Sequence, residues 1–257
     1  MTSDSAAVEL HPLAGVPEIA EGDDLGALIC AAAERSGLEL GDDDVVVISQ
    51  KAVSKAEGRV RRMAEVEPGE RATQLAAHLD KDPRLVELVL AESQRVVRAE
   101  RGVLIVETAG GLVCANAGID SSNVPGADAV TLLPVDSDDS ARRIRASIAA
   151  QCARRPAVVI SDSLGRPWRL GQAETAIGCA GLAALDDWRG RRDAHGRELT
   201  ATLIAVADEL AGAADLVRDK RSAIPVVLVR GAGRWRTDAD GPGAASMRRP
   251  AEEDLFR

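Results

Sequence analysis

The sequence contains very few aromatic residues, with no Tyr, one Phe and three Trp among its 257 residues. Apolar residues still make up 46%, so we expect a core of Ala, Val, Leu and Ile in one large or two small intertwined domains. No run approaches the roughly 18 consecutive apolar residues of a membrane span. The N-terminus shows no signal peptide. These absences predict a cytoplasmic protein with no membrane partner.

An excess of basic residues is also lacking, because 32 Lys and Arg stand against 41 Asp and Glu, a net charge of -9. We therefore expect no binding of nucleic acid over the whole surface, although a local basic pocket for an anionic substrate is compatible with this balance. The cysteines form no Cys-x-x-Cys pair, so neither a disulfide framework nor a zinc site is expected. We expect small buried hydrophobic side chains at Cys30, Cys114, Cys152 and Cys179.

The common nucleotide and hydrolase motifs are missing. The sequence has neither GxxxxGK[ST] nor a GxGxxG that follows a strand. It also lacks HExxH and GxSxG. Any nucleotide site in this chain must therefore be of an uncommon type.

Apolar periodicity predicts an irregular mixture of helices and strands, which favours an α+β fold with mixed sheets and packed helices. We predict a hairpin with strands over 103–108 and 112–115 and a Gly-Gly turn between them. Helices are expected over 24–36, 69–79, 84–99, 138–153 and 207–217. Strands are expected over 45–48, 157–160, 200–206 and 224–229.

Four polar segments follow apolar strands, where a rigid strand can aim the side chains of a site. The first, 49–59, contains Lys51, Lys55 and Arg59. Such a loop can hold phosphate oxygens, and a solvated basic turn is the alternative. The second, 116–124, places Asp120 among small residues and amides, which suits a hard, oxygen-ligated cation or, alternatively, an Asx turn.

The third segment, 160–171, is the most informative. Asp162 follows a β-branched strand and is placed to take a divalent metal, which Ser163 can also reach. Arg166 and Arg169 follow, so the segment favours a metal–phosphate site; the alternative is a structural Asp–Arg pair under Trp168. The fourth segment, 188–199, contains one histidine, His195, which is more often exposed than catalytic in such a loop.

Six motifs occur in order along the chain: GVPEI at 15–19, VSKAEGR at 53–59, NAGIDSSN at 116–123, SDSLGR at 161–166, GRRD at 190–193 and ADE at 207–209. Together they resemble the coenzyme F-420:L-glutamate ligase family, also called gamma-glutamyl ligases, over roughly residues 8–231. The segment 249–257 resembles the junction before the nitroreductase-like second domain of actinobacterial two-domain ligases. The resemblance implies a ligase domain over 8–235 and a tail or linker over 236–257.

The resemblance also implies an activity. GTP phosphorylates a carboxylate of the precursor F-420-0, and the amino group of L-glutamate then displaces phosphate; a second glutamate can follow through a gamma-linkage. Two divalent ions, Mg²⁺ or Mn²⁺, assist, as does K⁺, and an unusual α+β fold forms an intertwined homodimer. A fused or separate nitroreductase-like domain is a further expected partner.

Carried over residue by residue, the resemblance implies metal ligands at Asp120, Asp162, Ser163 and Asp219. It implies nucleotide contacts at Val16, Pro17, Glu18, Ile19, Gln50, Lys51, Lys55, Asn123 and Lys220. Catalytic roles fall to Asp162, Arg166 and Arg169, of which the arginines are inferred from charge alone. The chain departs from the family over 217–224, where the run VRDKRSAI replaces a Gly-rich segment with an acidic ligand.

Two other function classes remain open. A metal-dependent phosphohydrolase or GTPase could use the same acids, cations and metal. A non-catalytic nucleotide-binding or dimerisation module is the third hypothesis, and the presence of Asp120, Asp162 and Lys55 argues against it.

Overall fold

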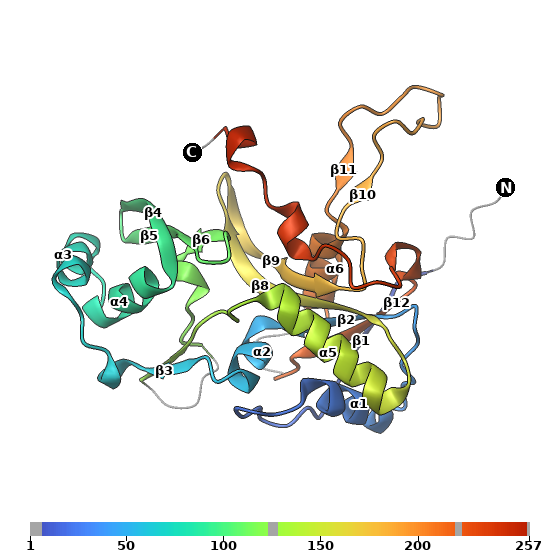
Figure 1. Ribbon diagram of the computed structural model, residues 1–257, viewed down its shortest axis with the longest axis horizontal. Coiled ribbons are helices and arrows are strands. Elements are labelled where there is room, and N and C mark those ends of the chain that lie inside the picture. The colour runs from blue at the N-terminus through green and yellow to red at the C-terminus, as the bar shows by residue number, and fades with distance from the viewer. Residues whose placement is uncertain (1–6, 123–127, 219–222, 256–257) are drawn as a thin grey trace.

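The computed structural model describes residues 7–122, 128–218 and 223–255. Its centre is a five-stranded sheet with the strand order β1-β12-β2-β8-β9 (Figure 1). β2 and β8 run parallel and the other neighbours antiparallel, so the mixed α+β class predicted from the sequence is confirmed. These strands are β1 (Glu9–Pro12), β12 (Val226–Arg230), β2 (Val45–Ser49), β8 (Ala157–Arg166) and β9 (Arg169–Ala180).

Helices cover both faces of this sheet (Figure 1). The first face packs against α1 (Leu25–Arg35), α2 (Gln50–Ala56) and α5 (Ser137–Cys152), and the second against α6 (Val206–Asp215). Strand β2 contributes side chains to the cores on both faces, because successive strand side chains point to opposite faces. The first core contains Val46 and Ile48 and the second contains Val45 and Val47, all fully buried. A strand covered on both sides needs an unbroken apolar run.

The first face is closed by a tight contact between α1 and α5. Asp24 caps α1 by accepting hydrogen bonds from the backbone N–H groups of Gly26 and Ala27, and it also accepts one from Ser147 of α5 at 2.5 Å. A Cβ at Gly26 would lie 2.3 Å from the Ser147 hydroxyl oxygen, so only glycine lets the helices approach this closely.

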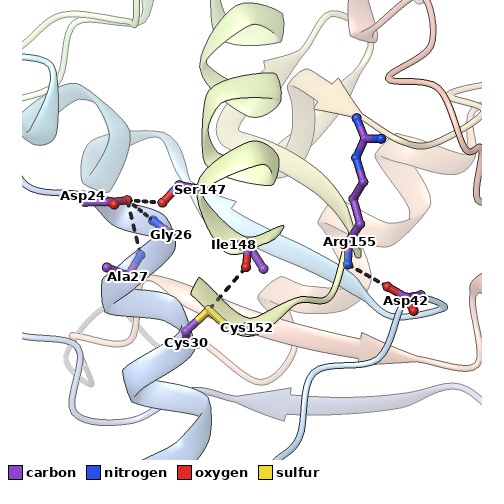
Figure 2. The surroundings of a disulfide bond; sticks show 9 residues. All are labelled: Asp24, Gly26, Ala27, Cys30, Asp42, Ser147, Ile148, Cys152 and Arg155. Atoms are coloured by element: carbon purple, nitrogen blue, oxygen red, sulfur yellow. Dashed lines mark hydrogen bonds between the residues drawn. A yellow bond between two sulfur atoms is a disulfide. The ribbon is translucent and has the colours of Figure 1, made fainter. Parts of the chain in front are cut away.

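A disulfide joins the same two helices (Figure 2). It links Cys30 to Cys152 with a Cα–Cα distance of 6.4 Å, so the expectation of four unpaired cysteines is wrong for these two. Cys114 and Cys179 are free and buried, as expected. The pair is 122 residues apart in the sequence, and only the packing of α1 against α5 brings it together.

A smaller lobe with its own core stands beside the sheet (Figure 1). Its core includes Leu79, Val86, Val89, Leu104 and Val106. The lobe consists of α3 (Glu70–Leu79), α4 (Pro83–Ala91) and the antiparallel strands β4 (Ser93–Glu100), β5 (Val103–Thr108) and β6 (Val113–Ala115). A two-stranded ribbon, β3 (Val60–Arg62) with β7 (Ala129–Thr131), and the short turns η1 (Met63–Glu65) and η2 (Asn116–Gly118) connect it to the rest.

Two sequence predictions fail in their element type. The helix predicted over 84–99 ends at Ala91, and Ser93 begins β4. Residues 93–99 satisfy a helical stripe locally, but Val96 pairs with Val106 of β5, and this cross-strand packing overrides the periodicity. The loop predicted after β2 is largely α2, whose polar residues lie on a short helix.

Two further segments differ in extent. The segment 160–171, predicted as a loop, is part of a long hairpin formed by β8 and β9, whose turn lies between Arg166 and Arg169. The strand predicted over 200–206 shrinks to β11 (Leu203–Ile204), paired with β10 (Asp186–Asp187), and Val206 already begins α6. The strand predicted over 157–160 begins at Ala157 as expected but continues to Arg166 as β8. The remaining predicted helices and strands and the 103–115 hairpin are confirmed to within two residues at each end.

The C-terminal segment returns to the sheet through the short turns η3 (Gly233–Trp235), η4 (Ala244–Met247) and η5 (Ala251–Glu253). Fully buried Arg145 of α5 holds it: the guanidinium donates to the carbonyls of Pro156 at 3.0 Å and Thr237 at 3.1 Å and to Asp240 Oδ1 at 2.7 Å.

In the described part of the chain, every helix is too short or too polar to span a bilayer.

Candidate functional site

The candidate site lies where the parallel strands β2 and β8 leave the apolar core. Ser49 and Ser161 are paired at this point, and the carboxyl ends of parallel strands share one edge of a sheet. Helix α2 follows β2 directly and presents Lys51, whose Nζ lies 2.5 Å from Asp120 Oδ2. Asp120 itself is held by backbone pairing with Thr131 of β7. Four segments therefore converge on one edge.

Asp120 is half-exposed and well provided with donors. Its carboxylate accepts hydrogen bonds from the Ser122 backbone N–H at 2.7 Å and the Ser122 hydroxyl at 3.0 Å. Partial burial acts to raise the pKa of Asp120, but the hydrogen bonds from Lys51 and Ser122 outweigh it and hold this pKa below its usual value. The Asx-type turn considered from the sequence is thus present, and it aims an ionised carboxylate at Lys51.

Asp162 differs sharply from Asp120. Removal from water, followed by the negative charge of Glu174, raises the pKa of Asp162 to about 7, against the lowering effect of Lys51. Among the described ion pairs none involves Asp162, so the structural Asp–Arg pair weighed from the sequence does not form. A carboxylate held without a counter-ion beside a second carboxylate is typical of a functional site.

Strand alternation divides the hairpin's polar residues between two faces. Asp162 lies on the face toward Lys51, whereas Ser161 and Ser163 point to the α6 face, because successive side chains alternate. On that second face the Glu174 carboxylate accepts hydrogen bonds from Ser161 at 2.6 Å and Ser163 at 2.5 Å. Arg218, just beyond α6, donates to Glu174 at 3.1 Å.

Sequence reasoning missed Glu174 as a site residue. It stands opposite Ser163 in the register of β8 and β9, eleven residues away along the chain, and no local spacing signals this pairing. One sequence feature could have pointed to Arg218, because it lies in the 217–224 run that departs from the family pattern. Recognising the hairpin would have been enough to place Glu174 beside the serines.

The two predicted catalytic arginines lie at the far end of the hairpin. Both are exposed, and Arg166 donates to the Leu170 carbonyl oxygen at 2.7 Å. Arg166 is four residues beyond Asp162, roughly 13 Å along an extended strand. The structure therefore brings neither Arg166 nor Arg169 to the carboxylates, and their phosphate-binding role stays a prediction. His195 is exposed on the β10–β11 arm.

The predicted nucleotide contacts gather around α2. Lys55 Nζ binds Glu18 Oε1 at 2.6 Å, so two predicted residues meet as an ion pair. Gln50 is buried and braces the helix by donating to Ser54 at 2.6 Å and to the Leu132 carbonyl at 3.1 Å. Beside Glu18, Val16 and Ile19 pack against the first core and Pro17 is exposed.

Three predicted residues lie outside the described part of the chain. They are Asn123, Asp219 and Lys220.

The oxygen donors of the site fit a hard divalent cation. Within residues 7–122, 128–218 and 223–255, no three His, Cys, Asp or Glu side chains group to hold a metal ion, which excludes a protein-only carboxylate cage there. Asp120 and Asp162 supply oxygens on the Lys51 face and Ser163 supplies one on the α6 face, and buried Asn116 Oδ1 lacks a hydrogen-bond partner among the described residues. Mg²⁺ keeps several waters and needs only one or two carboxylates, so a sparse oxygen set suits it.

Comparison with known proteins identifies the family of this chain. The family model of F420-0:Gamma-glutamyl ligase matches residues 15–231. The coenzyme F420:L-glutamate ligase of Methanothermobacter thermautotrophicus is 42% identical over 251 residues, which cover 97% of this chain and 99% of the relative. The proteins of the same name from Archaeoglobus fulgidus and Haloarcula marismortui are each 41% identical and cover 97% of this chain and 96% of the relative. The chain therefore belongs to the F420-0:gamma-glutamyl ligase family.

Proposed function

We propose that this protein is a GTP-dependent ligase that adds L-glutamate to F-420-0 in coenzyme F-420 biosynthesis, with gamma-linkage of any glutamate after the first. The observation that carries the proposal is the meeting of Lys51, Asp120 and Asp162 at one strand edge. Relatives named coenzyme F420:L-glutamate ligase, at 41–42% identity, support the same activity.

The proposed chemistry has two steps. A carboxylate oxygen of F-420-0 attacks the γ-phosphorus of GTP, the bond to the β–γ bridging oxygen breaks, and GDP leaves with an acyl phosphate remaining. The amino nitrogen of glutamate then attacks the acyl carbon, phosphate leaves, and the amine loses a proton as the amide forms. Both steps bring anions together, so cationic groups must offset the repulsion.

The chain's own residues divide this work. Lys55, released from Glu18, is available to a phosphate oxygen, and Lys51 neutralises charge beside Asp120. Asp120, Asp162 and Ser163 would hold two divalent ions, Mg²⁺ or Mn²⁺, with Asp219 as a further ligand. When bound, these ions withdraw charge from phosphoryl oxygens and bring the polyanionic substrates together. We also assign a supporting role to K⁺.

The test is mass spectrometry of the product after incubation with F-420-0, GTP, Mg²⁺ and L-glutamate. We expect a product heavier by one or more glutamyl residues, with GDP released only when F-420-0 is present. Release of GDP and phosphate in the absence of both F-420-0 and glutamate would instead identify a GTPase. No turnover of GTP under any combination would indicate a non-catalytic module.

We further propose a cytoplasmic homodimer that works with a nitroreductase-like domain, fused or separate. Static light scattering at micromolar concentration is expected to give twice the chain mass of 26.9 kDa. A mass of one chain would contradict the dimer.

A further inference from the structure

A buried ion pair on the α6 face of the β8–β9 hairpin has no role in the proposed chemistry so far. Arg218 Nη2 lies 3.1 Å from Glu174 Oε2, and each side chain is only 8% exposed. The same guanidinium nitrogen donates to the Ser161 hydroxyl at 3.1 Å. The two Glu174 oxygens together accept from both serines. Four side chains from three segments thus form one closed cluster.

We propose that Glu174 is a positioning residue that presents the Ser163 hydroxyl oxygen as a divalent-metal ligand, and that Arg218 holds Glu174 in place. This inference rests on the proposed function, in which Ser163 is one of the oxygen ligands of the two divalent ions. It assigns a role to two residues outside the predicted ligand set.

The direction of the hydrogen bonds supports this role. A serine hydroxyl has one proton to donate and two lone pairs, and Ser163 gives its proton to Glu174. Its lone pairs are then left for a cation, and donation into a carboxylate makes the oxygen a better electron donor. Glu174 acts through the serine, because its own oxygens are already occupied by two hydroxyls and a guanidinium.

The surroundings argue against a purely structural pair. On the same face, the neighbouring positions Val159, Ala176 and Cys179 are apolar and buried. Replacing such an ion pair with packed apolar side chains often leaves stability unchanged or improves it, so folding alone does not require these charges. Arg218 Nε is also buried without a partner among the described residues, a donor that packing leaves unused.

The experiment measures Mn²⁺ binding to the nucleotide-free protein by calorimetry and electron paramagnetic resonance. We expect Glu174→Gln and Ser163→Ala each to weaken one Mn²⁺ site by roughly 10- to 100-fold, the usual effect of losing a ligand or its outer partner. The double variant should bind no more weakly than the weaker single variant, because both changes remove one interaction. Arg218→Lys, which keeps the charge, should give a smaller loss at the same site.

The matched control is Glu107→Gln in the small lobe. Glu107 is also a strand glutamate paired with an arginine, Arg95, at 2.6 Å, but it lies on β5, outside the five-stranded sheet that carries Ser163 and Glu174. This change should leave Mn²⁺ affinity at the wild-type value. In turnover assays, Glu174→Gln should raise the Mg²⁺ concentration for half-maximal rate while kcat at saturating Mg²⁺ stays within about threefold of wild type.

Two outcomes would overturn the inference. If folded Glu174→Gln binds Mn²⁺ as tightly as wild type, Glu174 has no part in the metal site. If the Glu174→Gln and Ser163→Ala losses multiply, Glu174 is itself a ligand. Should Glu174→Gln fail to fold, Arg218→Lys decides by the same measurement. If the wild type makes glutamylated product but Glu174→Gln needs the same Mg²⁺ concentration for half-maximal rate, this inference alone is refuted. If the wild type makes no product, the proposed function is refuted.

Discussion

Two charged side chains beside the central sheet, Arg145 and Asp162, differ in whether the fold supplies them with partners. Arg145 is fully buried, yet carbonyl oxygens and the Asp240 carboxylate surround its guanidinium. Asp162 is only partly buried, but among the described residues it has no ion pair, and its pKa rises to about 7. The Arg145 charge is compensated by hydrogen bonds and an ion pair, whereas the ionised form of Asp162 destabilises the folded state.

Structural and functional charges in this fold differ in where their partners come from. A buried ion with every donor satisfied stabilises the elements that surround it, here α5 and the C-terminal segment. An ion that the fold leaves without a partner lowers stability, and a ligand of opposite charge recovers the loss. The comparison predicts that changes at Arg145 affect folding, and that changes at Asp162 affect binding and turnover.

The largest effect is expected from Arg145→Met. The substitution keeps the length of the side chain but removes all donors from the carbonyls of Pro156 and Thr237 and from Asp240. We expect the free energy of unfolding to fall by roughly 3–5 kcal/mol, the usual cost of breaking a buried pair. Denaturant unfolding measures it; Arg154→Met, on an exposed arginine with a 3.6 Å ion pair to Asp42, is the control and should change stability by less than about 1 kcal/mol.

Asp162→Asn should have the next largest effect, on turnover. The amide keeps the size of the carboxylate but removes the charge that a hard divalent ion prefers. We expect product formation to fall by at least about 100-fold, as happens when one well-placed electrostatic contact is removed. Mass spectrometry of the glutamylated product measures the rate. Wild-type rate and wild-type Mg²⁺ demand in a folded Asp162→Asn protein would remove Asp162 from the metal site.

The same substitution should stabilise the metal-free protein. Because the folded-state pKa of Asp162 lies above its ordinary value of 3.8, its proton is bound more tightly in the folded state. Its contribution to stability is therefore present at low pH and lost as the pH rises from about 4 to about 7. In chelator at pH 8 we expect Asp162→Asn to gain about 2 kcal/mol, a figure reduced for water screening at a partly exposed site.

Thermal unfolding at pH 4 and pH 8 checks this linkage. The gap between wild type and Asp162→Asn should close at pH 4, and added Mn²⁺ should stabilise wild type more than the variant. An equal gap at both pH values would show that Asp162 is not the group that titrates.

Lys55→Ala should have the smallest effect. Lys55 is paired with the exposed Glu18, an intermediate case between Arg145 and Asp162. It must give up this partner to bind a phosphate, so we expect GTP affinity to fall by about 1.5 kcal/mol, roughly tenfold. Isothermal titration with GTP measures the change. An unchanged Kd for Lys55→Ala would exclude Lys55 from the site.

The sequence predicted most elements because their signals are local. The run 45–48 is apolar on both faces, which specifies a covered strand, and the apolar stripe within 24–36 specifies α1. The helix predicted over 84–99 failed because residues 93–99 satisfy both periodicities, and pairing with β5 decides between them. The 160–171 segment was predicted as a loop because small and polar residues conceal a strand that needs β9 as a partner.

The sequence predicted several residues that meet at the candidate site, but neither Glu174 nor the arrangement of the group. Asp120, Asp162 and Lys55 stand in motifs that carry the resemblance, and Lys51 lies two residues before one of them. The structure brings Lys51 to Asp120 and Lys55 to Glu18. The arginines at 166 and 169 are near Asp162 in sequence, but an extended strand separates them from it.

Local patterns in the chain were enough to specify the α+β class, the central strands that are apolar on both faces, the family and the positions of Lys51, Asp120 and Asp162. These features follow from sequence patterns that repeat every two, three or four residues or from short motifs, and neither depends on contacts with distant segments. Only the tertiary structure decided that Cys30 meets Cys152, that Glu174 meets Ser161 and Ser163, and that Arg218 holds Glu174. The physical reason is that these contacts join distant segments, and their partners are chosen by helix packing and strand register rather than by spacing along the chain.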